Sequence, residues 1–186
     1  KGDDGTQILF GLTLLFITII FIFTYAIASF NLTSIQNKEF KSKKRHIAII
    51  ISNYQFYKHV SYLLVKIRTL LKNLRKESIP YKVYIIEKPV DFNKIIKKNI
   101  YGLIIFGHGT KHGLKIKDNI HYYCETKKNN NIKFAVQLHC NKGGKNSIKK
   151  YLNCKEFYPS NKIRTAKGIN KIITSEEFIK KINKTK

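Results

Sequence analysis

The chain lacks methionine and tryptophan, and it contains only three cysteines and three prolines. An odd number of cysteines without regular spacing argues against a disulfide framework, and a chain of 186 residues is too long to need one. The composition therefore allows a free, reactive thiol. Because methionine is absent, we expect that Lys1 is not a translational start and that the chain is processed or begins inside a longer reading frame.

Acidic residues are also scarce. The 11 Asp and Glu face 32 Lys and 4 Arg, which leaves a formal net charge of +25. A bias toward Lys, Asn and Ile is typical of an A/T-rich genome, whereas basic surfaces that bind nucleic acid use Arg as well as Lys. We expect the charge to favour anionic surfaces and acidic partners in a salt-dependent way, and we do not expect nucleic acid to be a partner.

One long run carries no charge at all. Ile8–Phe30 contains 23 uncharged residues, enough for a helix to cross about 30 Å of hydrocarbon. The run predicts a single transmembrane helix at 8–30, preceded by a short tail at 1–7 and followed by a basic linker at 31–44 and a domain at 45–186. Lysines after the run place that domain in the cytoplasm by the positive-inside rule. A buried core helix and a pilin-like assembly helix are the alternatives.

Beyond the linker, apolar segments alternate between the patterns of strands and helices. Short apolar runs of this kind are typical of buried parallel strands, and apolar residues at i, i+3, i+4 and i+7 indicate amphipathic helices. The expected strands are 46–51, 81–86, 101–106, 132–138 and one near 163–166; the expected helices are 54–76, a short one capped by Asp91, 147–152, and one capped by Thr174 and ending near 182; a hairpin with Asp118-Asn119 at its turn is expected at 114–123. This order predicts an α/β domain with a mainly parallel sheet and helices on both faces.

Two of the predicted strands end in residues that carry chemistry. The strand 101–106 runs into Gly107-His108-Gly109, and the strand 132–138 runs into His139-Cys140. Carboxyl ends of parallel strands meet at one edge of a sheet, so His108 and Cys140 can face one cleft if these strands are neighbours. An imidazole beside a thiol is a base beside a nucleophile, and the N–H groups of Gly109 and Cys140 are candidate oxyanion donors.

The stretches "LIIFGHGT" and "FAVQLHCNKGG" resemble the two signature blocks of the caspase-like cysteine peptidases, in particular the legumain, gingipain and CHAT-type branches. The resemblance covers about Arg45 to Asn183. It implies a caspase-like three-layer sandwich, a peptide or protein substrate, no cofactor, His108 as general base, Cys140 as nucleophile and Gly109 with Cys140 as oxyanion donors. The residue before the nucleophile is small in that family, whereas here it is His139, which we expect either to crowd the cleft or to act as a second base.

The sequence also allows three other interpretations of the domain. The first is a catalytically inactive relative that serves as a scaffold or as a pilin-like filament subunit. The second is a zinc site, for which His108, His112, His121 and Cys124 are the candidate ligands, although their spacing matches no standard zinc module. The third is a basic module that binds anionic lipid or nucleic acid, for which no recognition motif is present.

Overall fold

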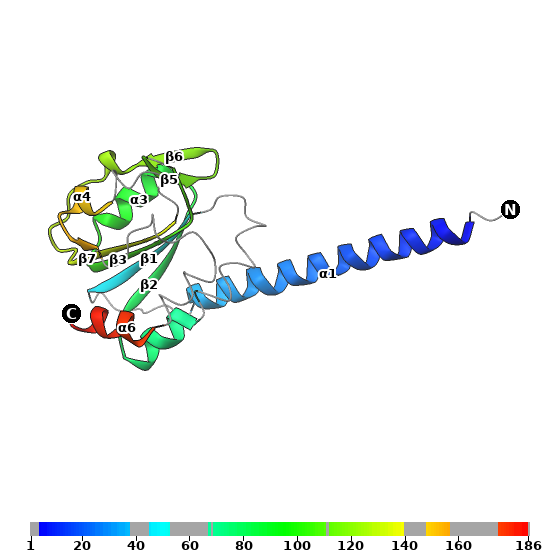
Figure 1. Ribbon diagram of the computed structural model, residues 1–186, viewed down its shortest axis with the longest axis horizontal. Helices are drawn as coiled ribbons and strands as arrows, with labels where there is room; N and C mark the ends of the chain where they lie inside the picture. The colour runs from blue at the N-terminus through cyan, green and yellow to red at the C-terminus, as the bar shows by residue number, and fades with distance from the viewer. Residues whose placement is uncertain are drawn as a thin grey trace.

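The computed structural model describes residues 4–37, 45–52, 67, 69–110, 112–139, 148–156 and 175–185. Its elements are α1 (Asp4–Asn37), β1 (His46–Ser52), a helical segment at 69–76, β2 (Tyr81–Ile86), α3 (Pro89–Ile96), β3 (Ile100–Phe106), β4 (His108–Gly109), β5 (Gly113–Ile116), β6 (Asn119–Tyr122), the 3₁₀ turn η1 (Tyr123–Glu125), β7 (Phe134–Leu138), α4 (Ile148–Leu152), β8 (Lys155–Glu156) and α6 (Glu176–Asn183). The domain combines a parallel sheet with helices, and the predicted α/β class is confirmed (Figure 1).

The main sheet is parallel throughout. Its strand order is β2-β1-β3-β7-β8, with four longer strands and the two-residue β8 at one edge. A second, three-stranded antiparallel sheet in the order β4-β5-β6 is inserted between β3 and β7. Because β3 and β7 are direct neighbours, the two strands that the motifs follow lie side by side, which meets the condition that the sequence left open.

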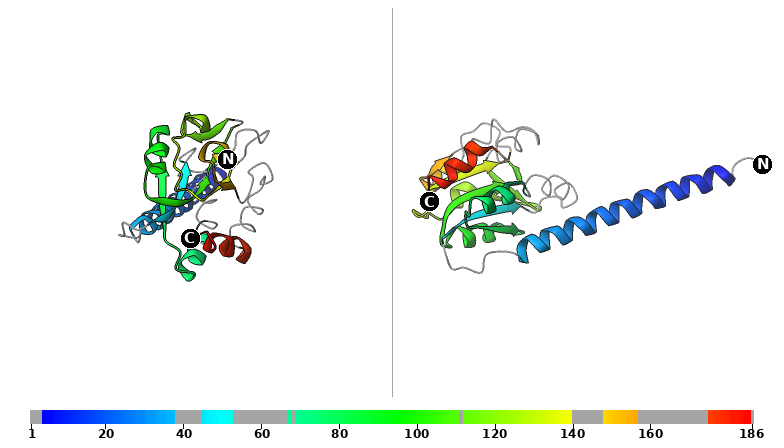
Figure 2. Two further views of the ribbon diagram at one scale, coloured as in Figure 1. Left: turned by 90° about the vertical axis from the view of Figure 1, so that its left-hand side faces the viewer. Right: turned by 90° about the horizontal axis from the view of Figure 1, so that it is seen from below.

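Two apolar clusters cover the two faces of the main sheet. On one face the helical segment 69–76 and α6 pack against alternate strand residues, and Figure 2 shows α6 beside the sheet. On the other face α3, α4 and the β5–β6 hairpin pack against the remaining strand residues. Every residue of β3 and β7 is buried, which explains why both strands read as continuous apolar runs rather than as alternating ones.

The N-terminal helix projects away from the α/β domain (Figures 1 and 2). Its segment Gly5–Phe23 has a mean hydropathy of 2.4 and is long and apolar enough to cross a membrane. The large apolar side chains from Ile8 to Phe23 are at least half exposed, so they do not belong to the core of the domain. The helix is longer than predicted: it includes residues 4–7 of the expected tail and 31–37 of the expected linker, because no proline or glycine interrupts 31–37.

Both predicted helix caps are wrong in detail. Asp91 was expected at the N-cap of α3, but it lies one turn inside, and its carboxylate accepts the backbone N–H of Lys88 at 3.2 Å. Pro89 starts this helix because its ring fixes φ near the helical value and its missing N–H is not needed there. The cap of α6 is Ser175, whose hydroxyl accepts the N–H of Phe178 at 3.2 Å. Thr174, the expected cap, lies outside the described residues.

The hairpin forms where it is expected, with a turn shifted by one residue. The turn residues are Lys117 and Asp118 rather than Asp118-Asn119, and Lys117 adopts a φ of +51°. The short strand β8 was not expected, and the strand expected near 163–166 lies outside the described residues. The predicted helix 54–76 is described only at 67 and 69–76, where it is helical and buries Leu70, Leu71 and Leu74.

Candidate functional site

The chain leaves the main sheet at Gly107, directly after β3 ends at Phe106. Gly107 has a φ of +155°, a conformation that residues with a side chain rarely adopt. A Cβ atom there would also fall well inside 3.0 Å of the Ser52 hydroxyl oxygen and 3.1 Å from Leu114 Cδ1. The first glycine of the motif is therefore required by the backbone and by two neighbouring elements, β1 and β5.

His108 follows at the carboxyl edge of the sheet, and its side chain is exposed. As part of β4 it pairs with Lys115 of β5. The connection from β4 to β5 is closed by Thr110, whose hydroxyl accepts the N–H groups of His112 at 3.2 Å and Gly113 at 3.1 Å. The Thr110 N–H donates to the Gly113 carbonyl at 2.8 Å. The predicted base is thus accessible to a substrate and is carried by a short sheet with a tightly bonded turn.

The strand that precedes the predicted nucleophile lies next to β3. Phe106 and Leu138 are partners in the parallel register. His108 stands two residues beyond Phe106 in the sequence, and Cys140 stands two residues beyond Leu138. Cys140 lies outside the described residues, so the proposed dyad stays a prediction. The structure shows only that the two strands leading to His108 and Cys140 are adjacent.

The side chain of His139 is buried, which argues against its expected role as a second base; whether it crowds the cleft stays a prediction, because Cys140 lies outside the described residues. The His139 side chain is only 2% exposed, and its Nε2 forms a hydrogen bond with the hydroxyl of Tyr123, whose side chain is fully buried. The two rings lie 5.8 Å apart between centroids. A bulky residue before Cys140 is therefore accommodated within the domain, and its imidazole is not exposed as that of a second base would be. No spacing in the sequence pairs Tyr123 with His139.

A buried serine hydroxyl also lies at this edge, and the sequence did not single it out. Ser52 ends β1, is fully buried, and its hydroxyl has no hydrogen-bond partner within the described residues. Its oxygen occupies the space that a side chain at Gly107 would need. The signal in the sequence was a polar residue ending an otherwise apolar strand, at the same edge as His108.

The alternative zinc site is not formed by the described residues. They contain no group of three or more His, Cys, Asp or Glu side chains placed to hold a metal ion. His121 is 1% exposed, stacks on Phe92 at 4.3 Å between ring centroids, and its Nε2 bonds with the Thr126 hydroxyl at 3.1 Å. Cys124, by contrast, is exposed. His121 is a core residue, and the four candidates do not converge.

Burial lowers the pKa of His121 to about 4 from its usual value of 6.5. The folded protein therefore holds this imidazole neutral, whereas the unfolded chain takes up a proton as the pH falls below 6.5. We expect the free energy of unfolding to be unaffected by His121 above pH 6.5 and to fall by about 3 kcal/mol in total between pH 6.5 and 4. Denaturation of wild type and His121→Gln at pH 7 and pH 4.5 tests this: the variant should lose less stability on acidification, and equal losses would contradict it.

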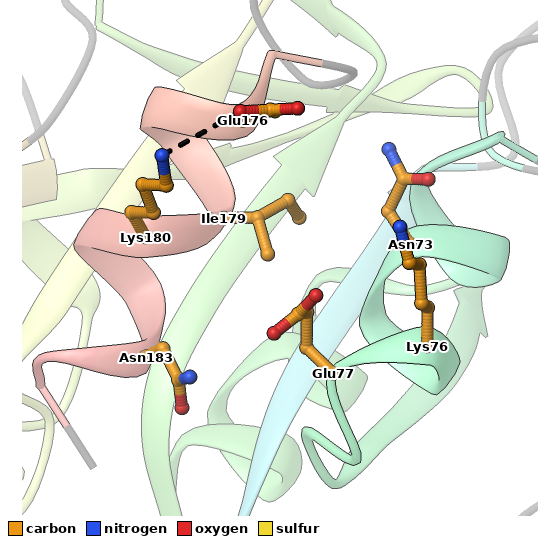
Figure 3. A pocket seen from close by; sticks show the side chains of 7 residues that line it. All are labelled: Asn73, Lys76, Glu77, Glu176, Ile179, Lys180 and Asn183. Carbon is orange, nitrogen blue, oxygen red and sulfur yellow. Dashed lines mark hydrogen bonds and ion pairs between the residues drawn. The ribbon is translucent and has the colours of Figure 1, made fainter.

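A cavity of about 430 Å³ lies elsewhere, between the helical segment 69–76 and α6 (Figure 3). Polar and charged side chains surround it, with Ile179 as its buried member and a 3.5 Å ion pair between Lys180 and Glu176 on one wall. It is lined by Asn73, Lys76, Glu77, Glu176, Ile179, Lys180 and Asn183. None of these residues belongs to the strand ends that carry the motifs, so the cavity is separate from the candidate site.

Comparisons with known proteins supply no further assignment. No protein-family model matches the chain. No match was found among curated proteins or among solved structures. The site is therefore defined by the two motifs, the register of β3 and β7, and the contacts around Gly107, His108 and His139.

Proposed function

We propose that residues 45–186 act as a caspase-like cysteine peptidase that hydrolyses peptide bonds, with Cys140 as nucleophile and His108 as general base. One observation carries the proposal: β3 and β7 are parallel neighbours in a register that pairs Phe106 with Leu138. The two reactive residues follow this pair at equal distances along the chain. The exposed position of His108 suits a base that must meet both a thiol and a substrate.

The reaction that this dyad supports proceeds in two steps. His108 takes the thiol proton, the Cys140 sulfur bonds to the carbonyl carbon of the substrate, and the peptide C–N bond breaks as His108 returns the proton to the leaving amine. Water then attacks the thioester carbon while His108 takes a proton from it, and the C–S bond breaks to regenerate the thiol. The N–H groups of Gly109 and Cys140 would stabilise the oxyanion in both steps, and no cofactor is needed.

In this proposal α1 anchors the peptidase to a membrane as a single-pass helix. The 19 residues Gly5–Phe23 would span about 28 Å as a helix, which matches the hydrocarbon core of a bilayer. The lysines after the helix favour a cytoplasmic domain under the positive-inside rule. The substrate would then be a peptide or protein within reach of the membrane surface.

The proposal is tested by labelling the full chain in detergent micelles with peptidyl acyloxymethyl ketones that differ in their P1 residue. We expect covalent labelling of wild type that disappears in Cys140→Ala. Cys124→Ala is the matched control, because Cys124 is an exposed cysteine outside the proposed site and its loss should leave labelling intact. Labelling that persists in Cys140→Ala, or no labelling with any P1 residue, would refute the peptidase, and the latter result would favour the inactive scaffold.

A further inference from the structure

A buried hydrogen bond joins the two chain segments that carry the proposed dyad. It connects the hydroxyl of Tyr123 in η1 to Nε2 of His139, the residue that precedes Cys140. Tyr123 is fully buried and His139 is 2% exposed. A polar pair at such depth favours one geometry, because breaking this hydrogen bond away from water is costly.

The small antiparallel sheet connects Tyr123 to His108. β6 leads directly into η1, β6 pairs with β5, and β5 pairs with β4, in which His108 lies. The backbone N–H of Tyr123 also donates to the carbonyl of His112 at 3.2 Å, within the connection that follows β4. The ring of Tyr123 is further held by Phe92 of α3, at 6.2 Å between centroids. Tyr123 therefore has a fixed position relative to the strand that carries the proposed base.

From this arrangement we infer that Tyr123 and His139 are positioning residues, which set the placement of Cys140 relative to His108 through their hydrogen bond. The inference rests on the proposed function. Neither side chain is open to a substrate, so the pair acts through the backbone that joins His139 to Cys140 and not by contact with the reacting atoms. This role also explains why a histidine can precede Cys140, where the caspase-like peptidases have a small residue. The imidazole of His139 is buried and hydrogen-bonded in the core.

The test begins with Tyr123→Phe, which keeps the ring and removes only the hydroxyl. A displacement of the nucleophile by about 1 Å is enough to slow a reaction by about 10²-fold. We therefore expect kcat for a fluorogenic peptide to fall by about 10- to 100-fold with KM unchanged. Tyr122→Phe is the matched control, because Tyr122 is the adjacent tyrosine, is 41% exposed and would lose the same atom. A Tyr123→Phe enzyme as fast as the control would overturn the inference.

A second readout does not depend on turnover. The rate at which iodoacetamide alkylates Cys140 is followed against pH in a Cys124→Ala background, since the third cysteine, Cys154, is buried. We expect Tyr123→Phe to shift the pH of half-maximal alkylation, and Tyr122→Phe not to shift it. A merely structural role of Tyr123 would lower thermal stability without moving this midpoint, and that outcome would overturn the inference.

A double-mutant cycle guards against a variant that folds poorly. His139→Ala alone removes the group that bonds to the buried Tyr123 hydroxyl, whereas His139→Ala with Tyr123→Phe removes both members of this hydrogen bond. We expect the double variant to alkylate faster than His139→Ala, and His139→Gln, which can still hydrogen-bond with the Tyr123 hydroxyl, to lie closest to wild type. Independent, additive effects would overturn the inference. If Cys140→Ala still hydrolyses peptide, the proposed function fails; if Cys140→Ala is inactive and the cycle is additive, only the positioning role fails.

Discussion

Under the proposed peptidase mechanism, replacing His108 with alanine is expected to slow peptide hydrolysis by about 10²- to 10⁴-fold, the range that a positioned general base contributes. The stability of the protein should hardly change, because the side chain is exposed on the two-residue strand β4 and contributes nothing to either apolar cluster. Substitutions at such surface positions usually alter the free energy of unfolding by no more than about 0.5 kcal/mol. The measurement is kcat/KM for a fluorogenic peptide, together with thermal unfolding of the full chain in detergent.

His112→Ala is the matched control for this experiment. His112 is an exposed histidine in the connection that follows β4, and its backbone, not its side chain, makes the hydrogen bonds to Thr110 and Tyr123. We expect its loss to leave hydrolysis within the experimental scatter of wild type. If both variants lost a comparable amount of rate, the cause would be a disturbed β4–β5 connection and not the loss of a base at His108. An unchanged rate in His108→Ala would remove the base from the mechanism.

Replacing Gly107 with alanine is expected to destabilise the protein by about 2–5 kcal/mol. A side chain at a φ of +155° is strained, and the new Cβ would collide with the Ser52 hydroxyl and press on Leu114 Cδ1. Overpacking alone typically costs about 1–3 kcal/mol, and the backbone adds about 1–2 kcal/mol. Chemical denaturation of the full chain in detergent, followed by circular dichroism, measures the change.

Two further variants separate the causes of this loss. Gly11→Ala is the control, because a Cβ at Gly11 meets nothing within 4 Å and alanine is favoured in a helix. Adding Ser52→Gly to Gly107→Ala should recover part of the stability by removing the collision with the hydroxyl, while the strained φ remains. A Gly107→Ala variant as stable as wild type would show that the chain can turn out of the sheet without glycine, and would contradict the tight packing of β1 against this turn.

The sheet was predictable because its strands are buried on both faces. Such strands must be apolar at every position, so β1, β2 and β3 could be recognised within a residue of their observed ends. Helix caps were less predictable, since Asp91 and Pro89 both favour the first turn of a helix, and in α3 Pro89 is the first residue while Asp91 lies at the third position. The hairpin turn moved to Lys117 for a similar reason: register along β5 and β6 is set by burial of Leu114 and Ile116, not by the preferred turn residues.

The residues of the candidate site could be found from the sequence, but their contacts could not. Its residues were visible in the sequence because glycine, histidine and cysteine are unusual at the ends of apolar strands, but their surroundings were not. Ser52 lies 55 residues before Gly107 in the sequence, and Tyr123 lies 16 residues before His139. Contacts of this kind depend on how two sheets and α3 pack together, and no local pattern encodes them. The burial of the His139 side chain against Tyr123 is the clearest case.

The sequence by itself determined the apolar N-terminal helix, the α/β class and the two motifs, because each follows from local composition and periodicity. Only the tertiary structure decided that β3 and β7 are neighbours, that Gly107 turns against Ser52, and that the His139 side chain is buried against Tyr123. The physical reason is that strand order and side-chain burial are settled by the packing of the whole domain. Residues far apart in the chain pack against one another, so no single segment determines which side chains are buried together.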